Sequence, residues 1–562
     1  MRPASGTIAR TRDLLLVTAV GLALAVLMTW PLASDLGGLG RTRATDADGQ
    51  FSIWNVSWVA RTIVADPLNL FDANIYHPHK LTLAYSEANL LPGIIGIPAY
   101  WITRNPWLTE NVVLLFGFTS AYVAMFLLLR HVTGDGAAAA VGAILYTFCP
   151  YVYSHLSHIQ LLMTGGIPLA MLAMHRFTDA VTNVESIHTV RVRSVWLGLA
   201  LAAQALSCAY YGIFAGLMVG FATLLFAVTR RLWKTPPYWI GIAAAAAISI
   251  VIVLPFFIPY LRVQAESGFA RTVEDAIRFS ARPHGYLASP ATAHRWLLDI
   301  ARGFGQWGEV LFPGLLAVTA GTAGIVIAAR RSARDRETAI LYGTLGVLAF
   351  WASFGPPAGL YSVLSLLPAF SFLRAPSRLG LVVVLCLALF AAFAFRALFD
   401  RAGRRRNVVA VMAGIVAIAE LAVVPLIWYR APDFPDSYKV LAASPRGPLA
   451  EFPFYGSRLA YPLHTQYMLF STAHWMPMIN GYSDVIPADF REAAPALSTF
   501  PSDDGLRVLA RRRVRYIAIH WDMFEGGRQD DVRQRLQKYL PYLRLLAQDD
   551  RMTIYEVLFY PL

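Results

Sequence analysis

Long apolar runs separated by short polar stretches fill roughly the first 430 residues of the chain. Most runs hold about 17–23 residues, which lets a helix cross a hydrocarbon layer roughly 30 Å thick. The pattern therefore predicts an α-helical polytopic membrane protein with about eleven transmembrane helices. The expected spans are 14–33, 110–130, 137–152, 159–175, 193–209, 212–229, 238–259, 309–329, 338–355, 378–396 and 407–428.

A further apolar segment, Ala88–Thr103, decides the topology. It is short, and prolines and glycines such as Pro92 and Pro98 interrupt it. If it crossed the membrane, the later arginine-rich loops, among them 330–336 and 396–406, would lie outside, against the positive-inside bias. We therefore expect an interfacial or re-entrant segment, an odd number of spans and a cytoplasmic N-terminus in the inner or plasma membrane.

This topology places three larger regions on the exoplasmic side: 34–109, 260–307 and 430–562. The short loops 150–158, 209–211 and 356–377 face the same way. Nearly all histidines, tryptophans, tyrosines and isolated carboxylates outside the spans lie in these regions, whereas the cytoplasmic loops carry mainly arginine. Catalytic and binding residues are therefore expected on the exoplasmic side of the membrane.

The last part of the chain has a different pattern. Short strand-like segments are predicted at 440–441, 449–453, 514–520 and 552–558, and an amphipathic helix at 532–546. These elements predict a small exoplasmic α/β domain over 430–562. The remainder, 1–429, is the expected transmembrane domain, with 34–109 as its first exoplasmic loop and interfacial helices within that loop.

Composition narrows the class of protein. Hydrophobic residues make up 56% of the 562 residues and charged residues only 15%, against roughly 25% charged in soluble domains. This excludes an ordinary cytosolic enzyme and a disordered chain. The net charge of +13 could indicate nucleic-acid binding, but the basic residues bracket the apolar runs, as cytoplasmic loops do. No nucleic-acid partner is expected.

Two acidic residues follow the first predicted span closely. Asp46 and Asp48 precede the segment Gln50–Val64, whose pattern predicts an amphipathic helix on the membrane surface. Acids so near lipid are costly to hold. They could bind a divalent cation such as Mg²⁺ or Mn²⁺, or Asp48 could accept a proton from a hydroxyl. The alternative is that Asp46 only caps the following helix.

The same loop carries further polar candidates. His77 and His79 stand two positions apart and are either metal ligands or interfacial hydrogen-bonding groups. Glu87 precedes the short apolar segment. It either meets Asp48 as a second carboxylate or caps the helix Leu90–Tyr100.

Candidate anion-binding residues lie in two of the short exoplasmic loops. His155, His158 and Gln160 stand at the start of a predicted span, and the histidines could hold a phosphate or shuttle a proton. Arg374 and Arg378 are exceptions to the inside bias, and two guanidinium groups suit a lipid phosphate or diphosphate. The alternatives are interfacial histidines with ordinary hydrogen bonds and arginines that snorkel to the interface.

Together these pieces resemble the GT-C superfamily of polytopic glycosyltransferases, in particular the bacterial branch related to protein mannosyltransferases and the lipid A aminoarabinose transferase. The resemblance covers the membrane part. The matching pieces are Asp48-Gly49 with Trp54 and Trp58, Tyr76-His77-Pro78, Leu83–Glu87, Pro150-Tyr151 with His155, His158 and Gln160, Leu373–Arg378, and Asn480–Ser483.

The resemblance implies an inverting glycosyltransferase that takes a sugar from a polyprenyl phosphate to an acceptor hydroxyl on a glycan, lipid or protein. It implies a base in the first loop, assigned to Asp48 first and Asp46 second. This chain departs from the family pattern here, because it has Asp-Ala-Asp where relatives carry adjacent acids. Glu87 is the third catalytic candidate. Donor phosphate binding is assigned to Arg374, Arg378, His155 and His158, and substrate binding to Tyr76, His77 and Gln160. A divalent cation at Asp46 and Asp48 is left open.

Two other classes of function are considered. A flippase or exporter of lipid-linked saccharides would carry ionisable residues within its spans and a repeat of two halves, and this sequence shows few of the former and no clear repeat. A non-catalytic membrane scaffold would tolerate joint replacement of Asp46, Asp48 and Glu87.

Overall fold

The computed structural model describes residues 5–43, 46–268, 271–367, 370 and 373–560. The chain divides into two compact units. The first joins Met1–Ser34, Leu114–Pro255 and Ala270–Ile427, and the second joins Asp35–Val113, Phe256–Phe269 and Trp428–Leu562. The units therefore divide the chain differently from the predicted ranges 1–429 and 430–562, because the first loop packs with the C-terminal region.

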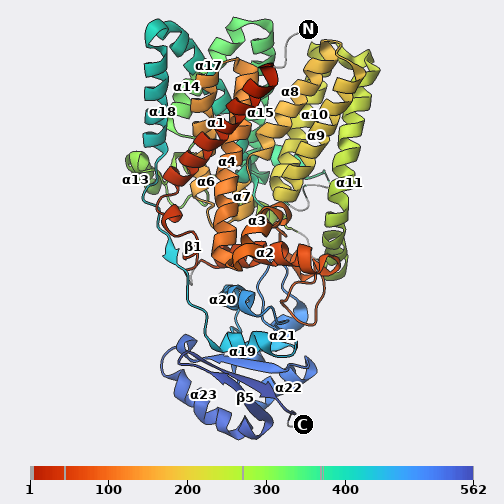
Figure 1. Cartoon of the computed structure of the whole chain (residues 1–562), viewed down its shortest axis with the longest axis vertical. Helices are drawn as coiled ribbons and strands as arrows, with labels where there is room; N and C mark the ends of the chain where they lie inside the picture. The colour runs from red at the N-terminus through yellow and green to blue at the C-terminus, as the bar shows by residue number, and fades with distance from the viewer. Residues whose placement is uncertain (1–4, 44–45, 269–270, 368–369, 371–372, 561–562) are drawn as a thin grey trace. The chain divides into compact units, whose positions relative to one another are not determined.

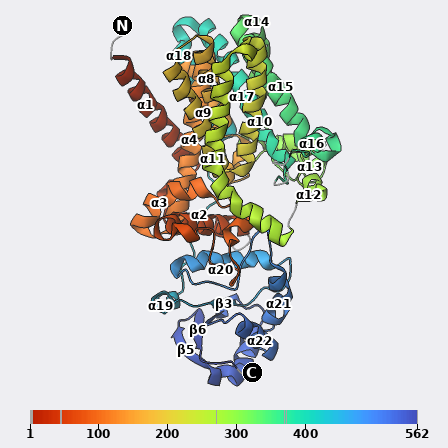
Figure 2. The same ribbon diagram turned by 90° about the vertical axis from the view of Figure 1, so that its right-hand side faces the viewer.

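The first unit is a bundle of long helices that run side by side (Figures 1 and 2). All eleven predicted spans overlap a helix. The helices are α1 (Ser5–Met28), α4 (Pro106–Thr133), α5 (Gly136–Thr147), α8 (Gly166–Thr182), α9 (Ile187–Ser207), α10 (Ala209–Thr229), α11 (Pro236–Ser267), α14 (Leu315–Arg331), α15 (Ala333–Ser353), α17 (Gly380–Ala402) and α18 (Arg406–Leu421). The first turns of α4 and the end of α11 belong to the second unit.

Six segments of the described residues are long and apolar enough to cross a membrane by length and composition. They are Thr11–Met28, Pro106–Thr133, Gly136–Tyr153, Ala209–Thr229, Pro236–Ser267 and Pro376–Leu421. The last of these contains both α17 and α18. Helices α8 and α14 have only 17 residues each, and α9 and α15 carry charged residues near their starts. The protein is thus a mostly helical polytopic membrane protein, and eleven spans remain a prediction.

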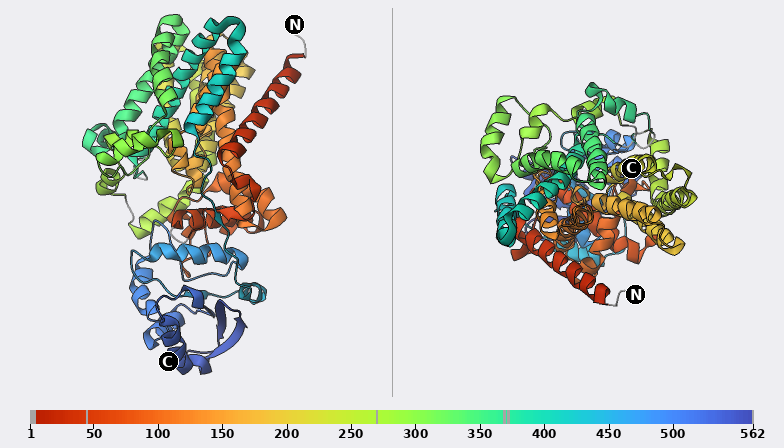
Figure 3. Two further views of the ribbon diagram at one scale, coloured as in Figure 1. Left: turned by 90° about the vertical axis from the view of Figure 1, so that its left-hand side faces the viewer. Right: turned by 90° about the horizontal axis from the view of Figure 1, so that it is seen from above.

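Helix α17 is the centre of the bundle and packs against α5, α14, α15 and α18. Small residues allow this close approach. A Cβ atom at Gly321 of α14 would lie 2.9 Å from the Leu387 carbonyl oxygen of α17, and one at Gly142 of α5 would lie 3.0 Å from that of Ala388. Helix α1 lies at the edge of the bundle and leaves it toward the N-terminus (Figure 3). Its Leu15 and Leu16 side chains are exposed, as lipid-facing residues would be.

Short helices connect the bundle on the side where the candidate anion-binding residues lie. They are α6 (Pro150–Tyr153), α7 (Ile159–Leu162), α12 (Val273–Arg278), α13 (Arg295–Gly303), α16 (Leu360–Leu364) and the 3₁₀ turn η9 (Pro376–Leu379). Turn η9 runs directly into α17. The chain therefore presents Arg378 at the very start of the central helix.

In the second unit, α2 (Ala47–Ala65) packs against α3 (Leu90–Thr103) and α20 (Thr465–Phe470) (Figure 2). The prediction of an amphipathic surface helix is wrong, because α2 is buried around most of its circumference from Gly49 to Ala60. Tertiary contacts cover the face that the pattern left to solvent. Helix α3 has 14 residues, and at 1.5 Å per residue it is too short to cross roughly 30 Å of hydrocarbon.

The C-terminal region carries a four-stranded mixed sheet in the order β3-β4-β6-β5. The strands are β3 (Leu449–Phe452), β4 (Tyr516–His520), β5 (Leu543–Gln548) and β6 (Met552–Val557). Strand β3 runs parallel to β4 with Leu449 opposite Tyr516, and β6 runs antiparallel to β4 and β5. A two-stranded sheet of β1 (Leu39–Gly40) and β2 (Tyr429–Arg430) ties the first loop to this region.

Four helices accompany this sheet: α19 (Ser437–Ala443), α21 (Ala488–Ser498), α22 (Asp503–Arg511) and α23 (Arg528–Leu536). The small α/β domain is confirmed, as are strands near 449–453, 514–520 and 552–558. Two local predictions are wrong. Residues 440–441 lie in helix α19, and the helix predicted over 532–546 ends as α23 at Leu536, followed by a 3₁₀ segment and the edge strand β5.

Candidate functional site

Arg378 is the most unusual charged residue of the first unit. Its exposed fraction is 9%, and its Nε atom is buried without a hydrogen-bond partner. Within the ranges that the structure describes, Arg378 forms no ion pair. The guanidinium lies 4.2 Å from the centroid of the Tyr210 ring, so the positive charge faces an aromatic surface. A buried charge without a counterion costs several kcal/mol, which favours binding of an anion.

Three loops far apart in sequence build the surroundings of Arg378. The backbone N–H of Arg374 donates to the Tyr210 hydroxyl at 2.8 Å, which joins the segment just before η9 to the start of α10. The next residue, Tyr211, has its hydroxyl 3.2 Å from the Tyr151 hydroxyl of α6. The short loops 150–158, 209–211 and 356–377 were predicted to face the same side, and these contacts bring residues of all three together.

His155 and Glu309 form a pair in the same unit. His155 Nε2 lies 3.2 Å from a Glu309 carboxylate oxygen, and Nδ1 lies 2.8 Å from the Tyr151 carbonyl oxygen. Both ring nitrogens therefore lie within hydrogen-bonding distance of oxygen atoms. Glu309 stands in the loop before α14. Burial opposes its ionisation, but the hydrogen bond from His155 and the charge of Arg378 hold the pKa of Glu309 below its usual range.

His158 differs from His155 in its electrostatics. Burial, together with the positive charges of His155 and Arg378, lowers the pKa of His158 to about 3. The ring is therefore neutral near pH 7, and it can donate or accept a hydrogen bond but supplies no fixed charge to a phosphate. Gln160 follows in α7, partly buried. The candidate anion site thus combines the positive charges of Arg374 and Arg378 with the negative charge of Glu309.

The predicted acids of the first loop lie in the second unit. Asp46 is the N-cap of α2: its side chain accepts the Gly49 N–H at 3.1 Å and the Arg41 Nε–H at 2.9 Å. Both carboxylate oxygens are therefore engaged, as the capping alternative predicted. Asp48 stands in the first turn of α2 and is exposed. Asp48 is thus the more accessible of the two acids.

Glu87 lies outside α2 but contacts this helix through its backbone. Its carbonyl oxygen accepts from Asn55 Nδ2 at 3.0 Å, and Asn55 is seven residues, or two turns, beyond Asp48 on one side of α2. At 1.5 Å per residue this is about 10 Å along the helix axis. The alternative that Glu87 caps the next helix is wrong, since the N-cap of α3 is Asn89.

The candidate substrate residues of this loop have different environments. Tyr76 is 0% exposed and packs edge-on against Phe490, so in this conformation it offers no surface to a substrate. His77 is half-buried, and its backbone N–H donates to the Met478 carbonyl oxygen. Burial and the charge of Arg512 lower its pKa. The substrate roles of both residues remain predictions, and the buried position does not support that of Tyr76.

The sequence left open whether Asp46 and Asp48 bind a metal ion. Among the described residues no group of three or more His, Cys, Asp and Glu side chains is placed to hold a metal ion. With the oxygens of Asp46 occupied by Arg41 and Gly49, a cation there would have to displace these contacts. The cation remains a proposal without a preformed cluster in this part of the chain.

Sequence reasoning missed the aromatic and acidic partners of the anion site. Tyr210 and Tyr211 stand in the shortest of the loops predicted to be exoplasmic, between two apolar runs, and two adjacent tyrosines in so short a loop were the available sign. Glu309 stands alone at the start of the predicted span 309–329, where no local pattern singles it out. Its pairing with His155 joins positions 154 residues apart, which no local pattern reveals.

Comparison with known proteins concerns the fold. No family model and no curated protein matches the sequence. The structure of ArnT from Cupriavidus metallidurans bound to undecaprenyl phosphate aligns with a TM-score of 0.43 and 14% identity over 99% of this chain and 98% of that chain. The archaeal oligosaccharyltransferase AglB from Archaeoglobus fulgidus, in complex with an inhibitory peptide and a dolichol-phosphate, aligns with a TM-score of 0.48 and 13% identity. The alignment covers 92% of this chain and 70% of that chain.

The apo form of the Archaeoglobus fulgidus oligosaccharyltransferase gives a TM-score of 0.49 at 15% identity, over 91% of this chain and 69% of that chain. These three alignments cover 91–99% of this chain at 13–15% identity, with TM-scores of 0.43–0.49. The similarity concerns the backbone fold only. The roles of residues are argued from the side chains of this protein alone.

Proposed function

We propose that this protein transfers a sugar from a polyprenyl phosphate to an acceptor hydroxyl on the exoplasmic face of the membrane, with inversion at the anomeric carbon. The observation that carries the proposal is the buried, ion-pair-free guanidinium of Arg378 at the start of α17. The phosphate of a lipid-linked donor is an anion delivered at membrane depth. Such a ligand supplies the direct ion pair that Arg378 does not form among the described residues.

Arg378 and Arg374 are the proposed phosphate-holding residues. Arg374 is partly buried over the Phe279 ring, 5.2 Å from its centroid, and Tyr210 contacts both arginines. A planar guanidinium can offer two parallel N–H donors to phosphate oxygens. Hydrogen bonds to charged groups contribute roughly 1.5–3 kcal/mol each. His155 adds a hydrogen-bonding ring, and His158 a neutral one.

The chemical step needs a base and a leaving group. A carboxylate takes the proton of the acceptor hydroxyl while its oxygen forms a bond to the anomeric carbon. The bond between that carbon and the phosphate oxygen breaks, and its electron pair leaves with the lipid phosphate held by the arginines. We assign the base to Asp48, because Asp46 is engaged with Arg41 and Gly49. Glu87 is the next candidate.

The alternative function is transport of a lipid-linked saccharide without transfer. It shares the anion site, so donor binding does not separate the two. Incubating the purified protein with radiolabelled polyprenyl-phosphate sugars and membrane extract does. The transferase proposal expects label to move to an acceptor, and label that remains on the lipid with every donor would favour transport.

The anion site is tested by titrating undecaprenyl phosphate against the purified full chain. Arg378→Ala should weaken binding ten- to hundredfold, and Arg378→Lys should restore only part, because an ammonium lacks the planar fork. Arg302→Ala, at an exposed arginine on α13 paired with Asp299, is the matched control and should bind as wild type. Equal affinity in wild type, both Arg378 variants and Arg374→Ala would remove these residues from the site.

A further inference from the structure

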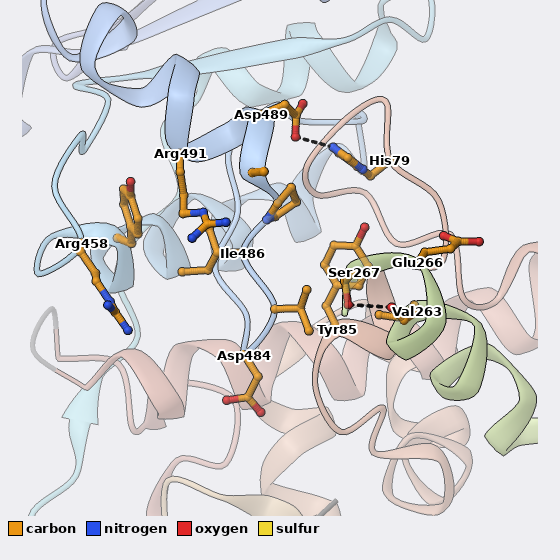
Figure 4. A pocket seen from close by; sticks show the side chains of 14 residues that line it. His79, Tyr85, Val263, Glu266, Ser267, Arg458, Asp484, Ile486, Asp489 and Arg491 are labelled. Carbon is orange, nitrogen blue, oxygen red and sulfur yellow. Dashed lines mark hydrogen bonds and ion pairs between the residues drawn. The ribbon is translucent and has the colours of Figure 1, made fainter. Parts of the chain in front are cut away.

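The second unit contains a pocket of about 760 Å³, within the range of roughly 300–1,000 Å³ found for ligand sites. Three stretches of chain form it, all within this unit: the first loop around His79 and Tyr85, the last turns of α11, and the C-terminal region (Figure 4). The C-terminal lining comprises Arg458, Tyr461 and the segment 484–489 with Arg491.

The lining mixes charges of both signs with aromatic rings. Glu266, Asp484 and Asp489 provide acceptors, while Arg458 and Arg491 provide donors. In the view of Figure 4 the two arginines lie toward one side and Glu266 toward the other. A pocket so charged is unsuited to a lipid chain.

Several of these groups are available to a ligand. Glu266, Arg458 and Arg491 are exposed and form no ion pair within the described ranges. Asp489, in contrast, pairs with His79 at 2.8 Å and with Arg512. These ion pairs hold its carboxylate in the pocket wall. Burial and the carboxylates of Glu266 and Asp489 raise the pKa of Tyr85 to about 12, which keeps its hydroxyl protonated as a donor.

The combination fits a polyhydroxyl ligand. Each sugar hydroxyl both donates and accepts a hydrogen bond, and therefore uses carboxylates and guanidinium groups together. The rings of Tyr85 and Tyr461 offer flat apolar surface for the faces of sugar rings. The volume accommodates more than a monosaccharide.

The pocket adjoins one of the candidate catalytic carboxylates. Tyr85 lines it, and the Ser86 hydroxyl donates to Asp484 of the opposite wall at 3.2 Å. Glu87 is the next residue along the chain, and the N–H of Ala88 is bound to the Tyr260 hydroxyl of α11 at 2.8 Å. Contacts on both sides of Glu87 thus fix its backbone beside the pocket.

We propose that this pocket binds the acceptor, and that the acceptor is a saccharide. The inference rests on the proposed function in so far as it speaks of an acceptor. The pocket binds the terminal sugars through Glu266, Arg458 and Arg491, with Tyr85 and Tyr461 beneath the rings. A peptide acceptor is the alternative outcome of the test.

The test measures equilibrium binding of short oligosaccharides of mannose, glucose, galactose and N-acetylglucosamine to the purified full chain, with a panel of short peptides in parallel. At least one oligosaccharide should bind saturably. Arg491→Ala and Glu266→Gln should each weaken that binding at least tenfold. Glu492→Ala, at the exposed neighbour of Arg491 on α21 that does not line the pocket, should leave it unchanged. Thermal unfolding checks that all variants fold.

Absence of saturable saccharide binding to wild type, or equal binding by the pocket variants, would overturn the inference. So would a peptide that binds saturably and loses affinity in the same two variants. The undecaprenyl phosphate titration separates this result from a failure of the proposed function. If saccharides bind but undecaprenyl phosphate does not, the pocket proposal stands and the transferase proposal is rejected. If undecaprenyl phosphate binds but no saccharide does, only the pocket proposal is rejected.

Discussion

Tyr210 covers Arg378: the guanidinium lies 4.2 Å from the centroid of the tyrosine ring. The hydroxyl of the same tyrosine accepts the backbone N–H of Arg374 at 2.8 Å. One side chain therefore orients both cations of the proposed phosphate site, one through its ring face and the other through its hydroxyl. The two contacts can be removed separately.

The first prediction separates these contacts. Tyr210→Phe keeps the ring and loses the hydrogen bond, so undecaprenyl phosphate affinity should fall only a few-fold. Tyr210→Leu also removes the aromatic face, whose interaction with a desolvated cation is worth about 2 kcal/mol, and affinity should fall at least a further tenfold. Equal losses in the two variants, measured by the same titration, would mean that the ring does not position Arg378.

A second prediction concerns the two acids at the start of α2. Asp48→Asn should lower turnover by about 10²–10⁴-fold, the usual contribution of a general base, with donor affinity unchanged. Asp46→Ala should instead lower stability by about 1 kcal/mol, because it removes a helix cap. Turnover and chemical unfolding measured on both variants give opposite patterns. Asp48→Asn with more than about a tenth of wild-type turnover would move the base to Glu87 or Asp46.

Metal removal provides a third prediction. Both oxygens of Asp46 are engaged by Arg41 and Gly49, so we expect EDTA to leave turnover unchanged. The control is readdition of Mg²⁺ or Mn²⁺ to the chelated enzyme. Activity that is lost with EDTA and restored by either cation would assign Asp46 and Asp48 to a metal site after all.

The pH dependence of stability gives a fourth prediction. The pKa of His158 is about 3 in the folded protein and about 6.5 in the unfolded chain. A lowered folded pKa means that the unfolded chain binds the proton more readily, so this contribution to stability is complete above pH 6.5 and is lost as pH falls toward 3. The Tm should therefore drop between pH 7 and pH 5, and drop less in His158→Gln. His188→Gln, at an exposed histidine of α9, should behave as wild type, and an identical drop in all three proteins would contradict the assignment.

The topology prediction uses single cysteines. Arg404→Cys in the turn between α17 and α18 and Arg528→Cys at the start of α23 are exposed positions. The native Cys149, Cys208 and Cys386 are buried, so background labelling should be low. In intact cells an impermeant thiol reagent should label the cysteine at position 528 and not the one at 404. Labelling of both from the same side would contradict an exoplasmic C-terminal domain.

The sequence alone predicted the helices of the bundle well, because backbone groups in lipid must be satisfied within each segment and the apolar runs therefore mark the helices. It also identified Arg378, since an arginine on the side that the inside bias depletes stands out locally. It failed for α2, whose polar face is covered by α3 and α20. The helix predicted over 532–546 was also too long, because Leu543–Gln548 forms strand β5 and pairs with β6.

What the sequence determined by itself is the helices of the bundle and the α/β character of the C-terminal region, because each of these depends on neighbours within one or two turns. Only the tertiary structure decided that Tyr210, 164 residues before Arg374, joins the two arginines. It alone paired His155 with Glu309 and brought Tyr85, Glu266 and Arg491 to one pocket. The physical reason is that these contacts join residues distant in sequence, whose approach depends on the packing of whole helices rather than on any local pattern.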